Sequence, residues 1–559
     1  MRLVCRFLSW LPMLWLCAAL PAHAGLQQAK LGAVASAHPI ATEAGFEVLA
    51  AGGNAFDAAV AVSAALAVVE PSGSGIGGGG FWLLHRAEDG KQVFVDGREK
   101  APLAATEHMY LDDAGRVIPR LSLDGPMAAG IPGQPAALVH LAEHYGRLPL
   151  GKSLAPAIRA AQQGFALDEH LRLRLQYRQA VLANNAAAEV FLPGGELPEV
   201  GTVIKQPDLA MTLLRLALNG HAGFYAGKTA EALVAGVQAA GGIWTQRDLA
   251  EYQVVEREPL RGEYRGYRIV SAPPPSSGGV ALIETLNILR FYPLDRFDAV
   301  KRSHVVVEAM RRAYRDRAQY LGDSDFVDVP VARLTGVQHA ADWVPGLSER
   351  QATPSSDLPA VLVDPPAGMD TTHFSVVDAA GNRVSATLSI NFPFGSGFMP
   401  AGTGVLLNNE MDDFSKKAGE PNGYGLVHSR ANGIAPGKRM LSSMTPTFIE
   451  QDQKIAVLGT PGGSRIISMV LLSALDYMHN QASAAQMVAL PRFHHQYLPD
   501  VIQHEPNGLA AEWLAGLQAM GHHTKAVSRQ YGNMHVVLQH GRGFDAASDP
   551  RGIGLAAVR

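Results

Sequence analysis

The pattern of apolar residues changes at residue 371, and this change constrains the fold more than any other feature of the chain. Residues 132–246 mainly follow a helical period. Residues 371–378 and 383–391 instead alternate apolar and polar side chains, as half-buried strands do, with a Gly-Asn turn between them. Because strand pairs here are flanked by helical blocks, the sequence predicts layers of sheet covered by helices.

A proline- and aspartate-rich segment, residues 351–370, leads into the first of these strands. Cleavage between Asp370 and Thr371 would make a threonine the new N-terminus. A threonine hydroxyl is a poor nucleophile at neutral pH, but an α-amine with a pKa of about 8 can act as its base. Thr371 would then carry both nucleophile and base. Thr372 is the alternative register, and His373 suggests a Ser/His pair, although a strand histidine is expected to pack or hydrogen-bond locally.

Other elements follow from local signals. A helix is expected at residues 54–70, with Asn54 as its cap and Pro71 after its end, and another at residues 303–321, with Ser303 as its cap. Further strands are expected at residues 81–85, 92–96, 405–407 and 455–458, and further helices at residues 134–144, 465–479 and 509–521.

The N-terminus has the features of a secretory signal. Two arginines precede an apolar stretch at residues 7–20, and Ala22-His23-Ala24 is a small-x-small cleavage site. The stretch is too short for a membrane anchor and is interrupted by Pro12. We therefore expect residues 1–24 to be a signal peptide and the mature protein to be periplasmic or secreted, with no membrane span.

Composition excludes several kinds of function. The 559 residues carry a formal net charge of -4 without a basic stripe, so nucleic acid is not an expected partner. The chain has 2 cysteines, Cys5 and Cys17, and both lie in the signal segment. The mature chain would therefore have no disulfide, no thiolate metal site and no cysteine nucleophile.

Three other motifs suggest ligand sites, but each lacks a feature that such a site requires. The glycine run at residues 73–80 lacks the Gly-Lys-Ser/Thr ending of a phosphate loop. The acidic segment 410–413 could be a solvated loop or a calcium site, but it lacks the alternating oxygen-ligand spacing of a calcium loop. The pairs at residues 494–495 and 522–523 invite a zinc hypothesis, yet their spacing does not suit one helix face. No metal ligand is predicted.

Nine stretches, in this order, together resemble the γ-glutamyltranspeptidase family of the N-terminal nucleophile hydrolases: GGNAFDAAVAV, GGGGFWLL, DGREKAP, PPPSSGG, TTHFSVVD, LLNNEMDDFS, KRMLSSMTPT, GTPGGSR and PRFHHQYLPD. The resemblance runs from the expected helix that begins at Asn54 nearly to the C-terminus. It implies an α/β fold in the form of a four-layer αββα sandwich. It also implies a precursor that cuts itself into a large subunit, residues 25–370, and a small subunit, residues 371–559, which remain together as a heterodimer. No cofactor is implied.

The resemblance also implies roles for individual residues. Thr371 corresponds to the nucleophile, and Ser389, where threonine is common, to a hydroxyl beside it. The other implied roles are an oxyanion hole at Gly462 and Gly463, a carboxylate site at Arg98, Ser442 and Ser443, an ammonium site at Glu410 and Asp413, substrate contact by Asn391, and a lid loop at residues 419–428 that contains Tyr424.

These roles predict a self-processing γ-glutamyltransferase or glutathione hydrolase. It would transfer the γ-glutamyl group of glutathione or related compounds to water, an amino acid or a peptide. A β-lactam side-chain acylase of the same fold is one alternative, disfavoured by the paired carboxylate and ammonium sites. An unprocessed protein that binds γ-glutamyl compounds is another, and Ser389 slightly favours it. A general Ser/His hydrolase lacks its Gly-x-Ser-x-Gly motif.

Overall fold

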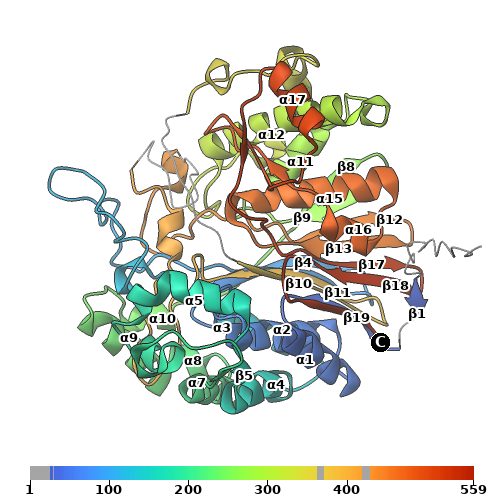
Figure 1. Ribbon diagram of the computed structural model, residues 1–559. Helices are drawn as coiled ribbons and strands as arrows, with labels where there is room; N and C mark the ends of the chain where they lie inside the picture. Colours follow the sequence, from blue (N-terminus) through green and yellow to red (C-terminus); the bar gives the residue numbers. More distant parts are fainter. Residues whose placement is uncertain (1–25, 29, 362–370, 418–428) are drawn as a thin grey trace, which may run out of the picture.

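The protein forms two stacked antiparallel sheets with helices on both outer faces (Figure 1). The computed structural model describes residues 26–28, 30–361, 371–417 and 429–559. The expected signal peptide, Asp370 and Tyr424 lie outside these ranges. Among the described residues, no helix combines the length and apolarity needed to cross a membrane.

The first sheet contains the predicted strand pair. Strand β10 lies between β2 and β11, and β11 pairs with β3, so the hairpin at residue 371 is central in its sheet. The order and bounds are β19 (Leu555–Val558), β2 (Gly32–Ser36), β10 (Thr372–Asp378), β11 (Arg383–Ser389), β3 (Gly79–His85), β4 (Gln92–Gly97) and β7 (Val255–Arg257).

The second sheet packs against the first, with β13 and β17 across from β10. Its order and bounds are β1 (Gln27–Gln28), β18 (Gly543–Ser548), β17 (His535–His540), β13 (Lys454–Gly459), β12 (Thr447–Gln451), β9 (Tyr267–Ser271) and β8 (Leu260–Tyr264). Smaller sheets pair β14 (Phe493–His494) with β15 (Ile502–His504) and β16 (Thr524–Ala526), and β5 (Phe165–Ala166) with β6 (Val203–Ile204).

Helices cover each outer face. On the first sheet lie α1 (Pro39–Ala50), α2 (Ala55–Val69) and α3 (Gln134–His144), with α4 (Leu150–Gln163), α5 (Glu169–Leu182), α6 (Ala187–Phe191), α7 (Pro207–Asn219), α8 (Ala222–Tyr225), α9 (Gly227–Ala239) and α10 (Gln246–Ala250) around them. On the second sheet lie α11 (Gly278–Leu289), α15 (Ile466–Asn480) and α16 (Ala484–Ala489), with α12 (Ala299–Tyr320), α13 (Val331–Leu334), α14 (Val337–Trp343) and α17 (Ala511–Ala519) beyond them.

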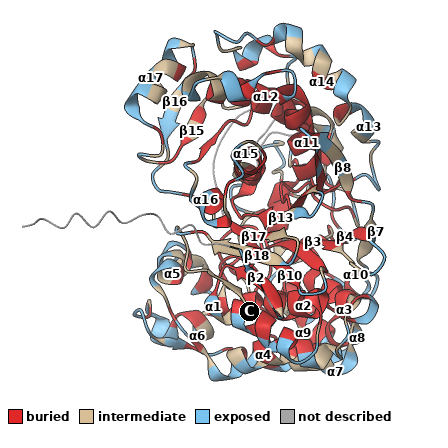
Figure 2. Ribbon diagram, turned by 90° about the vertical axis from the view of Figure 1, so that its right-hand side faces the viewer, coloured by how far each residue is buried: buried red, intermediate tan, exposed pale blue. Residues whose placement is uncertain are grey.

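Alternation along the strands divides the core into layers. In β3, Trp82 and Leu84 pack toward α2, while Phe81 and Leu83 face the second sheet. Figure 2 shows the buried residues concentrated in the two sheets and the helices next to them. Helix α2 is buried along its whole length, which explains its Ala/Val-rich sequence without a polar face. These layers confirm the predicted sheet-and-helix sandwich.

Two local predictions were wrong. Helix α12 begins at Ala299 rather than Ser303, because Asp298 caps it by accepting a hydrogen bond from the Lys301 N–H at 2.8 Å. Residues 405–407 are buried but form no strand. Their backbone bonds go to a neighbouring loop, as from Leu407 N–H to Phe398 O at 3.0 Å, and not to a ladder.

Candidate active site

One pocket collects most of the residues selected from the sequence. Its lining includes Thr371, Ser389, Asn391, Arg98, Glu410, Asp413, Ser442, Ser443 and Gly463. Ser389 ends β11 of the first sheet, and the other residues lie in segments that precede or follow strands of the two sheets. Segments on both sides of residue 371 therefore build the pocket together.

Thr371 immediately precedes β10 and is 6 % exposed. Since Thr372 pairs with Leu388 in the register of β10 and β11, Thr371 lies next to Ser389. By alternation Thr371 shares the inter-sheet side of β10 with His373, whereas Thr372 falls on the side of the buried Phe374. Thr371 lines the pocket and Thr372 does not.

His373 makes local contacts. Its ring lies 2.9 Å from Thr387 Oγ1 and 3.2 Å from Ser375 Oγ, and it packs closely against Gly459 of the second sheet. Burial, with a smaller effect from His535, holds the pKa of His373 well below its usual value. A neutral histidine engaged between the sheets agrees with the expectation of local hydrogen bonding.

Ser389 and Asn391 both reach the pocket, but not as two positions of one strand. Strand β11 ends at Ser389, and Asn391 has a left-handed backbone with φ of 73°. The Asn391 N–H donates to Ser389 Oγ at 2.7 Å, and its side chain donates to Asn409 O at 2.9 Å. A non-glycine residue at positive φ is uncommon and needs such support.

Arg98 joins the acidic residues at the floor of the pocket. Its Nη1 lies 2.6 Å from Glu410 Oε2, its Nη2 lies 2.6 Å from Asp413 Oδ2, and Glu99 Oε2 is 3.6 Å away from Nη1. Arg98, Glu99 and Glu410 are at most 1 % exposed. The residues expected to bind opposite ends of an amino acid thus pair with one another.

Burial changes the acidity of this cluster. It raises the pKa of Glu410 and of Glu99 to about 7, against the opposing effect of Arg98. It also raises the pKa of Asp413 to about 8, and the charge of Glu410 adds to that rise. Three carboxyl groups around one guanidinium therefore share protons near neutral pH.

The serine pair is held from the side of α11. Ser277 donates from both its N–H and its hydroxyl to Ser442 O, at 2.8 and 2.7 Å. Ser276 forms a bridge with Ser442 and donates its hydroxyl to Met444 O at 2.6 Å. These contacts explain why the PPPSSGG stretch contains two adjacent serines. The stretch precedes residue 371 in the sequence, whereas the serine pair that it supports follows residue 371.

Gly462 and Gly463 begin the turn that leads into α15. Their φ angles are 141° and 57°, a region that favours glycine. Among the described residues, neither N–H donates to a protein acceptor. Both groups precede the N-terminus of a helix, where backbone N–H groups favour negative charge. Gly463 lines the pocket.

The sequence did not single out every lining residue. Arg317, Leu441, Met444, Ser464 and Ile466 also line the pocket. Arg317 lies within residues 303–321, where the sequence predicted a helix. Helical spacing alone gives no reason to place this residue beside residue 371. Leu441, Met444 and Ser464 lie next to selected positions, so their motifs offered the only available signal.

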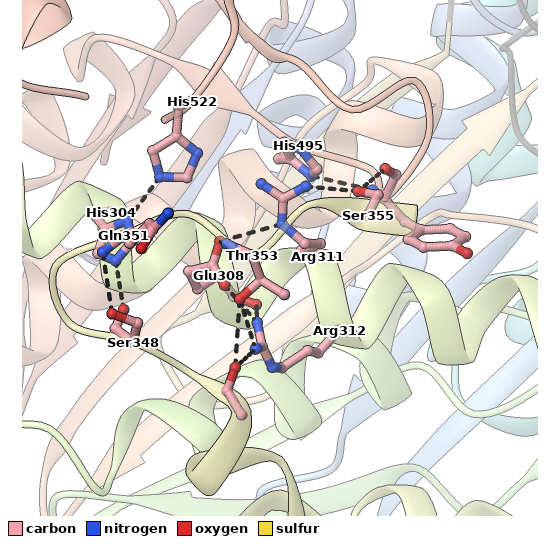
Figure 3. Close-up of polar contacts among 12 residues, drawn as sticks. His304, Glu308, Arg311, Arg312, Ser348, Gln351, Thr353, Ser355, His495 and His522 are labelled. Atoms are coloured by element: carbon pink, nitrogen blue, oxygen red, sulfur yellow. Dashed lines mark hydrogen bonds and ion pairs between the residues drawn. The ribbon is translucent and has the colours of Figure 1, made fainter. Parts of the chain in front are cut away.

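Two residue groups outside the pocket resemble metal sites. In the first, His304 Nε2 donates to Ser348 O at 2.7 Å, so its Nδ1 accepts from His522 Nε2, also at 2.7 Å (Figure 3). Glu308 accepts hydrogen bonds from Arg311 and Arg312. The donor atoms are already used and two guanidinium groups would repel a cation, so this group does not fit a metal.

The second group is Glu284, Asp316 and His339. Asp316 accepts from His339 Nε2 at 2.6 Å and from Arg315 Nη1 at 2.7 Å. Burial raises the pKa of Glu284 to about 8, and hydrogen bonding to Asp316 raises that of His339 to about 10. A neutral acid, a carboxylate and a protonated imidazole already balance their charges. A metal would first have to displace the imidazolium proton.

The pocket combines parts suited to acyl transfer. A hydroxyl stands at the start of a central strand, and two N–H groups that have no protein acceptor in the described part of the chain stand near a helix N-terminus. Acidic residues and arginines line the same pocket. Such an arrangement can stabilise a tetrahedral oxyanion and hold a zwitterionic group.

Comparison with known proteins gives consistent similarities. Residues 41–558 match the family model described as Gamma-glutamyltranspeptidase. The chain is 44 % identical over 515 residues to the glutathione hydrolase proenzyme of Pseudomonas sp. (strain A14), covering 90 % of this chain and 89 % of that protein. The cephalosporin acylase structure from Bacillus halodurans superposes with a TM-score of 0.84 at 28 % identity, covering 98 % of this chain and 99 % of the other.

The Helicobacter pylori γ-glutamyltranspeptidase structure has a TM-score of 0.58 at 42 % identity, and the match covers 60 % of this chain and 97 % of the other. These neighbours confirm the fold class that the sequence predicted.

Proposed function

The chain belongs to the γ-glutamyltranspeptidase family, and on that premise we propose that it is a self-processing γ-glutamyltransferase and glutathione hydrolase. The observation that carries the proposal is one pocket in which Thr371 lies with both a cationic and an acidic set of side chains. Only a substrate with a carboxylate and an ammonium group near its acyl carbon uses both sets.

Processing would cut the bond between Asp370 and Thr371 and give subunits of residues 25–370 and 371–559, after removal of residues 1–24 on export to the periplasm or medium. The freed α-amine of Thr371 would then lie on the residue whose hydroxyl it activates. Its pKa of about 8 suits a general base near neutral pH.

The proposed reaction has two steps. Thr371 Oγ attacks the γ-amide carbonyl, the α-amine takes the hydroxyl proton, and the N–H groups of Gly462 and Gly463 stabilise the oxyanion. The C–N bond breaks, and the leaving amine takes up that proton. Water or the amine of an acceptor amino acid or peptide then attacks the γ-glutamyl ester and restores the free threonine.

Substrate binding follows from the charges. The donor's α-carboxylate would lie against Arg98, Ser442 and Ser443, and its α-ammonium against Glu410 and Asp413. The two substrate groups would take the place of the ion pairs that Arg98 forms with Glu410 and Asp413. We place Asn391 beside the donor, held by Ser389, and Tyr424 in a lid over it.

The test is a pair of substitutions at the nucleophile. Thr371→Ala should remain a single chain and release no product from a γ-glutamyl anilide. Thr371→Ser keeps a hydroxyl and should process and turn over, more slowly. Normal processing of Thr371→Ala would overturn the assignment of Thr371.

A β-lactam side-chain acylase is the second candidate, because the cephalosporin acylase structure matches the chain along nearly its whole length. An acyl group without an ammonium would leave Glu410 and Asp413 buried without a cationic ligand, which costs free energy. Hydrolysis of a glutaryl anilide faster than a γ-glutamyl anilide would favour the acylase.

A further inference from the structure

Arg317 lines the pocket beside the residues of the proposed carboxylate site. It belongs to the last turn of α12 and is 1 % exposed. Its Nε donates to Ser277 Oγ at 2.9 Å, and its Nη2 donates to Ser443 Oγ at 3.1 Å. Its Nη1 is buried and has no hydrogen-bond partner among the described residues.

The charge of Asp413 favours the Arg317 guanidinium, but only from beyond ion-pair distance. Arg98 has carboxylate partners at 2.6 Å on both of its terminal nitrogens. Within the described ranges, Arg317 forms no ion pair. Burial lowers its pKa to about 10, so the guanidinium is still charged at neutral pH. A buried charge without a counter-ion is unfavourable, which indicates that an anion joins it when the pocket is filled.

Its contacts lead to the two serines. Because Ser443 Oγ accepts from Arg317, the Ser443 hydroxyl proton is available for an acceptor in the pocket. Ser442 Oγ likewise accepts from the Met444 N–H at 3.0 Å, which leaves its own proton available. Ser277, the second partner of Arg317, donates to Ser442 O. One guanidinium therefore contacts the Ser443 hydroxyl directly and the Ser442 backbone through Ser277.

We propose that Arg317 is a positioning residue for an anionic group of the substrate: it fixes Ser443, and through Ser277 the Ser442 segment, and it supplies the positive charge that Arg98 does not have in excess. The proposal rests on the proposed function and narrows it. The donor's carboxylate would be selected by two arginines, one beside it and one acting through the serines, while Glu410 and Asp413 balance Arg98 and the ammonium.

The experiment compares two donors that differ at one group. One is L-γ-glutamyl p-nitroanilide, and the other is the same anilide with its α-carboxylate converted to a primary amide. Each is assayed with the processed wild-type enzyme, Arg317→Lys and Arg317→Gln. Arg317→Gln should raise KM for the carboxylate donor by about tenfold or more, the range for losing a charged hydrogen-bond partner. Its effect on the amide donor should be much smaller.

The KM of Arg317→Lys for the carboxylate donor should lie between those of the wild-type enzyme and Arg317→Gln. Lysine keeps the charge but cannot bond Ser277 and Ser443 with a planar fork. The matched control is Arg311→Gln, which removes another buried guanidinium from α12 without touching the pocket. Any loss in this control should be the same for both donors.

Equal losses of kcat/KM for both donors in the Arg317 variants would overturn the proposal and leave only a structural role. If Arg317→Gln does not process, the donor ratio of Arg317→Lys decides in the same way. Wild-type enzyme that turns over neither donor would instead contradict the proposed function, so the two failures are distinguishable.

Discussion

At the scale of single residues, the charged side chains of the pocket form ion pairs with one another. The charged groups of the substrate would replace one partner in each of these pairs. Arg98 bridges Glu410 and Asp413, and each of these groups is almost fully enclosed. Isolated, any of them would be costly to bury. A bound amino-acid group carries one charge of each sign, so it can separate these pairs without leaving an unpaired charge.

The raised acid pKa values give a prediction on pH. The carboxyl of Asp413, with a pKa of about 8, is protonated below that value and then binds an ammonium poorly. Glu410→Gln removes a negative neighbour that raises this pKa, so the Asp413 pKa should fall. The acid limb of the kcat/KM profile for a γ-glutamyl anilide should therefore move to lower pH, while KM at high pH increases.

Glu256→Gln, which changes an exposed acid on β7 outside the pocket, is the control and should leave the limb in place. A limb that stays fixed in Glu410→Gln would show that the pH dependence comes from another group, such as the α-amine of Thr371.

At the scale of elements, side-chain hydrogen bonds hold the N-terminus of α2 in place beside the first sheet. Asn54 accepts from the N–H groups of Phe56 and Asp57, and Asp57 accepts in return from the Asn54 N–H at 2.9 Å. The Asn54 side chain also donates to Tyr145 O at 2.7 Å. The cap thus joins α2 to the end of α3.

Asn54→Ala should lower the free energy of unfolding by about 1–2 kcal/mol, because it removes the cap and strands a buried carbonyl. Asn54→Ser keeps a capping oxygen and should lose less. Thermal unfolding of the unprocessed Thr371→Ala background, in which one chain unfolds, measures both. Equal midpoints for the alanine variant and its parent would contradict this account of the cap.

Elements with a strong period or a clear cap were predictable. Helix α2 and the strand pair β10 and β11 follow from patterns that each segment carries alone. Residues 405–407 have the apolar composition of a strand, but a strand also requires a partner, and partners are set by tertiary structure. Helix α12 extends to Asp298 because an earlier residue offers a better cap than the buried Ser303.

The same limit applies to the site. Motif resemblance selected residues whose type and spacing are shared with a family, and the structure gathers most of them at one pocket. The sequence did not single out Arg317, because the role of this residue depends on which side chains lie opposite it in the folded protein. Asn391 was placed on a strand face, since the left-handed turn after Ser389 has no glycine to announce it.

At the scale of the whole molecule, residue 371 divides the sequence but not the fold. In the first sheet, β10 and β11 lie between β2 and β3, which come from before residue 371, and in the second sheet β12 pairs with β9. Each sheet therefore needs strands from both sides of residue 371, and neither part of the chain could close a core alone.

This interleaving predicts that the processed subunits co-elute as one species in size-exclusion chromatography, even at low protein concentration and high salt. They should separate only in denaturant, because the buried sheet ladders between them must be broken. Elution as two folded species under native conditions would contradict the interleaved arrangement.

The central claim is that Thr371 becomes an N-terminus and serves as the nucleophile. Intact mass measurement with N-terminal sequencing of the purified protein tests it most directly. We expect two fragments, the smaller beginning Thr-Thr-His-Phe-Ser. A single chain, or a small fragment beginning at Thr372 or elsewhere, would contradict it.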